Sequence, residues 1–157
     1  MRAIPPRVSA VASALVLTVL AGCSGGAGSA AVSVRDPAVG AVPTGSAALY
    51  MTVENHSADD AILGASCECA TEASLHVVED RGGILMMVPT DRIELPADSS
   101  TDLDPGGAHI MLEGLEEPLE AGGSIRVTIR FDRAPQRTVE VPVHELADLA
   151  ERVESQP

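Results

Sequence analysis

The stretch Leu75–Leu112 reads LHVVEDRGGILMMVPTDRIELPADSSTDLDPGGAHIML, and the rest of the chain is organised around it. Ten residues separate His76 from Met87. Twenty-one more lead to His109, and Met111 follows two positions later. Two imidazoles and two thioethers make a soft, uncharged ligand set, in which thioether sulfur selects Cu(I) and imidazole suits copper. We interpret this stretch as a single copper site.

A β-hairpin is predicted at the start of the stretch. Residues 75–80 and 84–88 have strand-like composition, and the short glycine-containing link Arg81-Gly82-Gly83 joins them. With Arg81-Gly82 as a two-residue turn, paired positions sum to 163, and His76 lies directly opposite Met87. Met86 then points to the other face. A bulge at the two glycines would shift the register by one residue and favour Met86 instead.

The second ligand pair needs only strand geometry. Residues i and i+2 of a strand share a face, so His109 and Met111 project together while Ile110 points away. Two pairs of side chains carried by strands are therefore expected to meet around one ion.

This stretch resembles the periplasmic copper chaperones called PCuAC. Their signature is His, ten residues, Met, twenty-one residues and His-x-Met, which His76, Met87, His109 and Met111 reproduce without adjustment. Similar text surrounds it, over roughly residues 45 to 143: MMVP, IELPA, PGGAHIML and EEPLEAGGSIRVTIRF. The resemblance implies an all-β fold, a cupredoxin-like antiparallel β-sandwich of Greek-key type. It also implies that the four residues bind Cu(I) and that the protein helps to load cytochrome oxidase.

Composition excludes several other classes of function. The chain of 157 residues carries a net charge of −13, which disfavours binding to nucleic acid or to anionic membranes through charge. It has one Phe, one Tyr and no Trp, so it offers no platform for stacking bases. No Ser-His-Asp order, phosphate loop or suitably placed carboxylate pair is visible, so we do not expect an enzyme.

The N-terminus has the pattern of an export signal. Arg2 and Arg7 precede the apolar run 11–20, which is too short to span a bilayer. Leu-Ala-Gly-Cys at 20–23 resembles a lipobox, which implies a signal peptide over 1–22 and lipidation of Cys23; an ordinary secretory leader is the alternative. Residues 23–31 then form a lipidated flexible tether. The expected location is extracytoplasmic, with the lipid anchor holding the protein on the outer face of the cytoplasmic membrane.

The copper-binding domain is expected to span residues 32–143. Clean alternation predicts that Leu49, Met51 and Val53 share one face, and that Ile125, Val127, Ile129 and Phe131 point inward. The tail, 144–157, has the composition of a short helix or a frayed end, and its single His144 is not assigned to metal. Further strands are expected over 32–42, 46–55, 61–66, 91–97 and 138–143, with another opening into a loop over 99–107.

Two further features are ambiguous. Cys67 and Cys69 could form a local disulfide, remain a free dithiol or supply an auxiliary copper ligand; an exported protein favours a disulfide or structural thiols. A disulfide at this spacing needs a turn or a strained ring. His56 lies in a polar turn cluster and is expected to be a solvated surface residue.

The function that follows is a Cu(I) metallochaperone. The acceptor implied by the resemblance is the copper centre of cytochrome c oxidase subunit II, reached directly or through a Sco-type copper protein. A cupredoxin-like electron-transfer protein is one alternative, although a blue-copper site needs a Cys that the ligand stretch lacks. A metal-free surface lipoprotein is the other.

Overall fold

A computed structural model describes residues 31–149 of the chain, and most of them lie in ten β-strands. The predicted signal peptide, Cys23 and most of the predicted tether therefore lie outside the described residues, as does the tail beyond residue 149. The strands are β1 (Val32–Gly40), β2 (Gly45–Asn55), β3 (Asp60–Cys67), β4 (Ala70–Asp80), β5 (Leu85–Thr90), β6 (Ile93–Leu95), β7 (Ser99–Leu103), β8 (His109–Leu115), β9 (Ser124–Phe131) and β10 (Arg137–His144).

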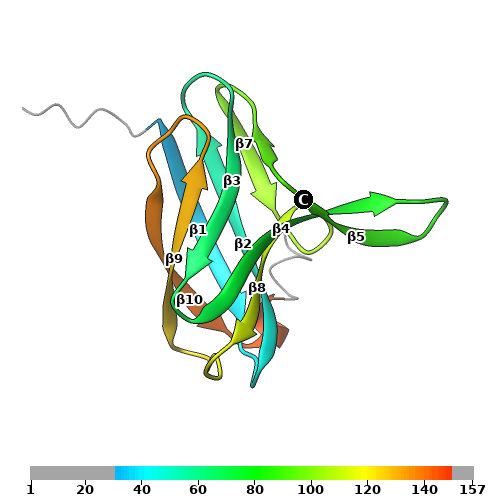
Figure 1. Ribbon diagram of the computed structural model, residues 1–157, viewed down its shortest axis with the longest axis vertical. Helices are drawn as coiled ribbons and strands as arrows, with labels where there is room; N and C mark the ends of the chain where they lie inside the picture. The colour runs from blue at the N-terminus through cyan, green and yellow to red at the C-terminus, as the bar shows by residue number, and fades with distance from the viewer. Residues whose placement is uncertain (1–30, 150–157) are drawn as a thin grey trace, which may run out of the picture.

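The strands pack as a sandwich whose two layers are continuous along one edge (Figure 1). The first layer has the order β5-β4-β8-β2-β1, and β7 pairs with β2 beyond the end of β8. The second layer has the order β10-β9-β3-β6. The predicted all-β sandwich is confirmed. One detail differs from a purely antiparallel arrangement, because β1 pairs with β10 in parallel through Val39↔Val143 and Gly40↔His144.

The core lies between the layers and is almost entirely aliphatic. Leu49, Met51 and Val53 of β2 are buried, as their alternation predicts, and so are Val127, Ile129 and Phe131 of β9. Ile110 and Leu112 bring the inner face of β8 into the same cluster. Because β-strand side chains alternate, His109 and Met111 must lie on the opposite face of β8, away from this core.

The hairpin of β4 and β5 forms, but the predicted register is wrong. Paired positions sum to 165, so His76 lies opposite Pro89, and Met87 lies opposite Val78. The turn is Gly82-Gly83, closed by the bond from the Arg81 N–H to the Ile84 carbonyl, and both glycines have positive φ, at 72° and 88°. A two-residue turn of type I′ needs positive φ at both central positions, which favours Gly-Gly over Arg-Gly.

Cys67 and Cys69 form a disulfide at the corner where the chain passes from one layer to the other. Cys67 ends β3, residues 68 and 69 make the turn, and Ala70 begins β4. The turn supplies the geometry that a bond between residues i and i+2 requires, with Cα atoms 5.1 Å apart. Of the readings open from sequence, the structure therefore has the local disulfide.

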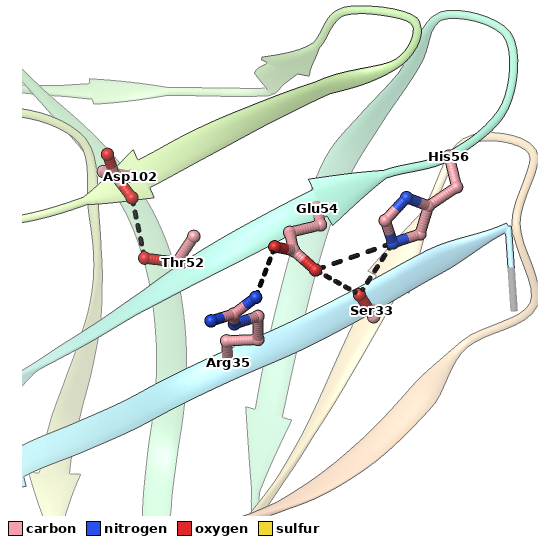
Figure 2. Close-up of polar contacts among 6 residues, drawn as sticks. All are labelled: Ser33, Arg35, Thr52, Glu54, His56 and Asp102. Atoms are coloured by element: carbon pink, nitrogen blue, oxygen red, sulfur yellow. Dashed lines mark hydrogen bonds and ion pairs between the residues drawn. The ribbon is translucent and has the colours of Figure 1, made fainter. Parts of the chain in front are cut away.

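A polar row runs over the outer surface of β1, β2 and β7 (Figure 2). Arg35 pairs with Glu54 at 2.8 Å, and Thr52 donates a hydrogen bond to Asp102 at 2.7 Å. These residues share the outer face of the first layer, so that face is polar at the end where β7 joins it. Residues 146–149 are helical, and within the described part of the chain no helix is long and apolar enough to cross a membrane.

Asn55 ties the turn after β2 to β6 and is itself almost fully buried. Its Nδ2 donates toward the carbonyls of Ala58, Leu95 and Pro96 at 2.9, 2.9 and 3.0 Å, and its Oδ1 accepts from the Ser57 N–H. A buried group left without its partners costs about 1–3 kcal/mol.

We expect Asn55→Ala to lower the free energy of unfolding by about 3 kcal/mol, because several backbone groups lose one shared partner. Urea unfolding measures this. Asn55→Asp should be no better, because a carboxylate facing three carbonyls accepts but cannot donate. The neighbouring exposed variant His56→Ala should change stability by less than about 0.5 kcal/mol; an equal loss in both variants would remove the special role of Asn55.

Candidate metal centre

Two histidines meet face to face on the outer surface of the first layer. His76 of β4 and His109 of β8 are direct cross-strand partners, and their rings stack with centroids 5.6 Å apart and planes 27° from parallel. Cross-strand neighbours of this kind have Cβ atoms about 5 Å apart. The sheet register alone therefore brings together two imidazoles that are separated by 32 residues in the sequence.

The nitrogen atoms of this pair lack the partners that buried polar atoms normally have. Nε2 of His109 and Nδ1 of His76 are buried, and neither has a hydrogen-bond partner among residues 31–149. Nδ1 of His109 lies 3.2 Å from the Gly107 carbonyl, which can only accept, so Nδ1 carries the proton and Nε2 keeps its lone pair. In metal-binding histidines, a hydrogen bond of this kind from the other ring nitrogen holds the imidazole in its orientation.

Ser74 adds a third atom of the same kind. It lies two residues before His76 on the same face of β4, and it is the direct partner of Met111 on β8. Its Oγ is also buried and has no partner within the described part of the chain. Three unpartnered polar atoms thus gather on one small block of sheet, although each costs folding free energy. Such a block fits a site that is completed by something it binds.

Met111 completes the block with a thioether. It stands opposite Ser74 on β4 and opposite Ala48 on β2, one position along the face from His109, and it is half-buried. The structure therefore brings His76, His109 and Met111 together, as the i, i+2 and cross-strand relations require.

Met87 is placed differently from the other three. Its direct partner on β4 is Val78, two residues after His76, so Met87 lies on the same face as His76. Met87 is not directly opposite His76 but is its diagonal neighbour, nearer the tip of the hairpin. Diagonal neighbours are about 7–8 Å apart, within reach of a long flexible side chain. Met87 is 53% exposed, whereas His109 is 2% exposed. Met86 pairs with Glu79 and points to the opposite face.

Tyr50 covers the buried side of the pair. Its ring lies 6.3 Å from the His109 ring, tilted by 56°, and it comes from β2 beside β8. Burial raises the pKa of the Tyr50 hydroxyl, and the negative charge of Asp104 raises it further, so the phenol stays neutral at physiological pH. Tyr50 therefore shields His109 from water without adding a charge to the site.

The other sequence candidates lie elsewhere. His56 contacts Ser33 at 3.2 Å and Glu54 at 3.6 Å on the polar row, as expected of a surface residue (Figure 2). The disulfide of Cys67 lies just before β4 begins, roughly 20 Å along that strand from His76. Among residues 31–149, no three His, Cys, Asp or Glu side chains gather into a group that could hold a metal.

Sequence reasoning missed Ser74 and Tyr50. Both lie on the outer face next to the histidines, but their proximity depends on how β4 and β2 align with β8. Alternation along the strand predicted that Tyr50 shares the outward face with Thr52. Nothing in the sequence indicated that Tyr50 would lie against His109.

Comparisons with known proteins agree with this architecture. The sequence profile of the family described as "Putative lipoprotein LpqE-like" matches residues 32–143. A curated relative, "Putative lipoprotein Lxx21020" from Leifsonia xyli subsp. xyli (strain CTCB07), is 38% identical over 118 residues, which are 74% of this chain and 71% of the relative.

Two solved structures share the fold. The copper-bound PCuAC domain from PmoF2 is 23% identical, with a TM-score of 0.63, and the match covers 73% of this chain and 93% of that domain. The Cu(I)-bound solution structure of DR1885 from Deinococcus radiodurans is 27% identical, with a TM-score of 0.54, over 74% of this chain and 78% of that one.

Proposed function

Because the chain belongs to the LpqE-like family of lipoproteins and has the fold of PCuAC domains, we propose that it is an extracytoplasmic Cu(I) carrier. The proposed ligands are His76, His109 and Met111 on the outer face of the first layer, with Met87 from the hairpin. The observation that carries the proposal is the pair of buried, unpartnered imidazole nitrogens.

The donor set suits monovalent copper. Neutral imidazole nitrogen and thioether sulfur are soft, and neither has to lose a proton to bind. The Gly107 carbonyl holds the His109 ring in the tautomer whose Nε2 can act as a donor. The related Cu(I)-bound and copper-bound structures support the same metal for this chain.

The burial of the ligands is graded, which suits a carrier. His109 is enclosed by the sheet and Tyr50, Met111 is half-buried, and Met87 stands in solvent on the hairpin. A ligand that is exposed and uncharged can be exchanged first, so that an incoming thiolate takes its place while the histidines still hold the ion. The structure thus supports transfer of Cu(I) rather than catalysis.

The electron-transfer alternative is less well supported. A blue-copper site binds its metal through a cysteine thiolate. Cys67 and Cys69 are paired with each other at the far end of β4. An intense visible absorption band on addition of one equivalent of Cu(II) would favour that alternative, and failure to take up Cu(I) against a chromophoric chelator would favour a metal-free surface lipoprotein.

We further propose that the acceptor is the copper centre of cytochrome c oxidase subunit II, reached directly or through a Sco-type copper protein. Cleavage before Cys23 and lipidation of that residue would keep the carrier at the outer face of the cytoplasmic membrane, beside a membrane-bound acceptor. Metabolic labelling with a radioactive fatty acid tests the anchor, because Cys23→Ala should remove the label and release the protein.

Met87 and Met86 are adjacent but lie on opposite faces, which provides a matched pair of variants. We expect Met87→Leu to weaken Cu(I) binding about tenfold or more, because it removes one donor while keeping side-chain volume, and Met86→Leu to leave binding unchanged. Competition with a chromophoric Cu(I) chelator measures both affinities. Weaker binding in Met86→Leu with normal binding in Met87→Leu would show that the hairpin presents the other methionine to copper.

A further inference from the structure

The tip of the β4–β5 hairpin is the most exposed apolar segment of the described chain. Ile84 and Leu85 are 66% and 70% exposed, and Met86 and Met87 follow them directly. The hairpin projects beyond the sandwich, so both of its faces are open (Figure 1). Leu85 and Met87 lie on the face of His76, and Ile84 and Met86 lie on the other. We call these four residues the hairpin strip.

The strip also has a free backbone edge, because β5 is the last strand of its layer. The Arg81–Ile84 pair closes the turn with a hydrogen bond, and hydrogen-bonded pairs alternate along an antiparallel ladder. The backbone N–H and C=O groups of Met86, Val88 and Thr90 therefore bond to β4. The backbone groups of Leu85, Met87 and Pro89 point away from β4, toward the free edge. Pro89 has no N–H to offer, so pairing by a new strand is limited to the segment from Leu85 to Met87.

The charges around the strip select among possible occupants. Arg81 pairs with Glu79 at 3.0 Å and Arg92 pairs with Glu94 at 2.6 Å, so both local cations are neutralised. The negative charges of Asp80 and Asp91 remain near the strip, and the net charge of the whole chain is −13. A second copy of this chain or an anionic lipid surface would be repelled. An apolar segment bordered by basic residues would be attracted.

We propose that the hairpin strip is the docking surface for a copper-exchange partner that adds an extended, apolar, basic-flanked segment carrying a thiol along the outer edge of β5. This inference rests on the proposed function, because it gives Met87 a second role at the exchange step. The partner's thiol releases its proton to solvent, and the resulting thiolate replaces the Met87 thioether on Cu(I). The copper remains monovalent throughout, and the thioether returns to solvent uncharged. Strand addition of this kind takes affinity from the main chain and specificity from side chains.

The test uses two synthetic peptides as probes. One alternates valine and leucine around two cysteines and has arginines at both ends; the other replaces the valines and leucines with serine. Cu(I) transfer from the loaded chain is followed by stopped-flow, with a small chromophoric chelator as a second acceptor that needs no docking. We expect transfer to the apolar peptide to be about tenfold faster than to the serine peptide.

The matched variants are Leu85→Ser on the strip and Leu146→Ser. Leu146 lies in the short helical segment near the C-terminal end of the described residues, and its side chain is 61% exposed. Leu85→Ser should remove the preference for the apolar peptide while Cu(I) affinity and transfer to the chelator stay unchanged, and Leu146→Ser should change neither. Equal rates for both peptides, or a preference that survives Leu85→Ser, would overturn the docking surface.

Failure of the copper assignment is detected separately. If the chain takes up no Cu(I), the proposed carrier function fails, and docking is then read from amide chemical shifts of the metal-free chain. The apolar peptide should shift the Leu85 and Met87 amides and leave Leu146 unchanged. Shifts that are absent, or that spread evenly over the protein, would overturn the docking surface without reference to copper.

Discussion

His109→Ala is expected to weaken Cu(I) binding at least about 100-fold, more than any other single substitution in the site. His109 is the most buried of the four proposed ligands, and its ring is already oriented by the Gly107 carbonyl. Loss of an outer-shell partner alone typically costs 10–100-fold in metal affinity, so loss of a pre-oriented ligand should cost at least as much. Chelator competition at neutral pH measures the effect.

Two companion variants separate ligation from folding. His76→Ala removes the stacked partner, which is only half-buried, so it leaves no enclosed cavity and should weaken binding to a similar degree. Ser74→Ala removes a neighbouring buried hydroxyl and should leave Cu(I) affinity within about twofold, because a hard oxygen contributes little to Cu(I). Near-normal binding in both histidine variants would contradict the site.

The second large effect concerns stability. Asp60 begins β3 and is buried, and its carboxylate accepts the N–H groups of Ala61, Arg133 and Ala134 at 2.8, 2.9 and 2.8 Å. Burial raises the pKa of Asp60, but the backbone hydrogen bonds lower it by more, so the net pKa lies below its usual range. The carboxylate thereby fixes the turn after β9 to the start of β3.

We expect Asp60→Ala to lower the free energy of unfolding by about 3 kcal/mol or more at pH 7, because three backbone donors lose their acceptor. A folded-state pKa below the unfolded value of about 3.9 contributes stability that is complete above that value. It is lost as the pH falls through the folded-state pKa. Urea unfolding between pH 7 and pH 2 should therefore show a wild-type loss that Asp60→Ala lacks.

The control for Asp60 is Asp91→Asn, at an exposed carboxylate. It should change stability by less than about 0.5 kcal/mol and keep the wild-type pH profile. If Asp60→Ala retained the full acid-dependent loss, the stabilising hydrogen bonds would have to be assigned to another carboxylate.

Much of the fold could be predicted from alternation alone. Leu49, Met51 and Val53 are buried on one face of β2 because strand side chains alternate, and the same holds for Val127, Ile129 and Phe131 of β9. The sequence predicts the hairpin, but it places the turn at Arg81-Gly82, one residue too early. The correct choice, Gly82-Gly83, follows from a local rule, since an arginine at a position of positive φ is strained.

The rest depends on contacts between residues far apart in sequence. The stacking of His76 on His109 needs the register of β4 on β8, and the cover of Tyr50 needs that of β2 on β8. Two of the three donors to Asp60, Arg133 and Ala134, are 73 and 74 residues away in the sequence. A ligand spacing can indicate that four residues act together, but only the sheet shows that one of them is enclosed and another exposed.

The exposed position of Met87 links the carrier proposal to the hairpin strip. A buried fourth ligand would hold copper more firmly but would have to move before an acceptor could replace it. Met87 instead lies at the base of an apolar segment that projects from the sandwich, so one side chain can serve both binding and exchange. The histidines then provide the affinity, and the hairpin provides access.

The most direct test is a ¹³C-methyl methionine spectrum recorded as Cu(I) is added to one equivalent. We expect the Met87 and Met111 methyl signals to shift and saturate together, while those of the buried Met51 and of Met86 stay in place. The site on the outer face of β4, β5 and β8 would be contradicted if Cu(I) binding saturated while the Met111 methyl signal stayed in place. It would also be contradicted if the Met86 signal shifted in place of the Met87 signal.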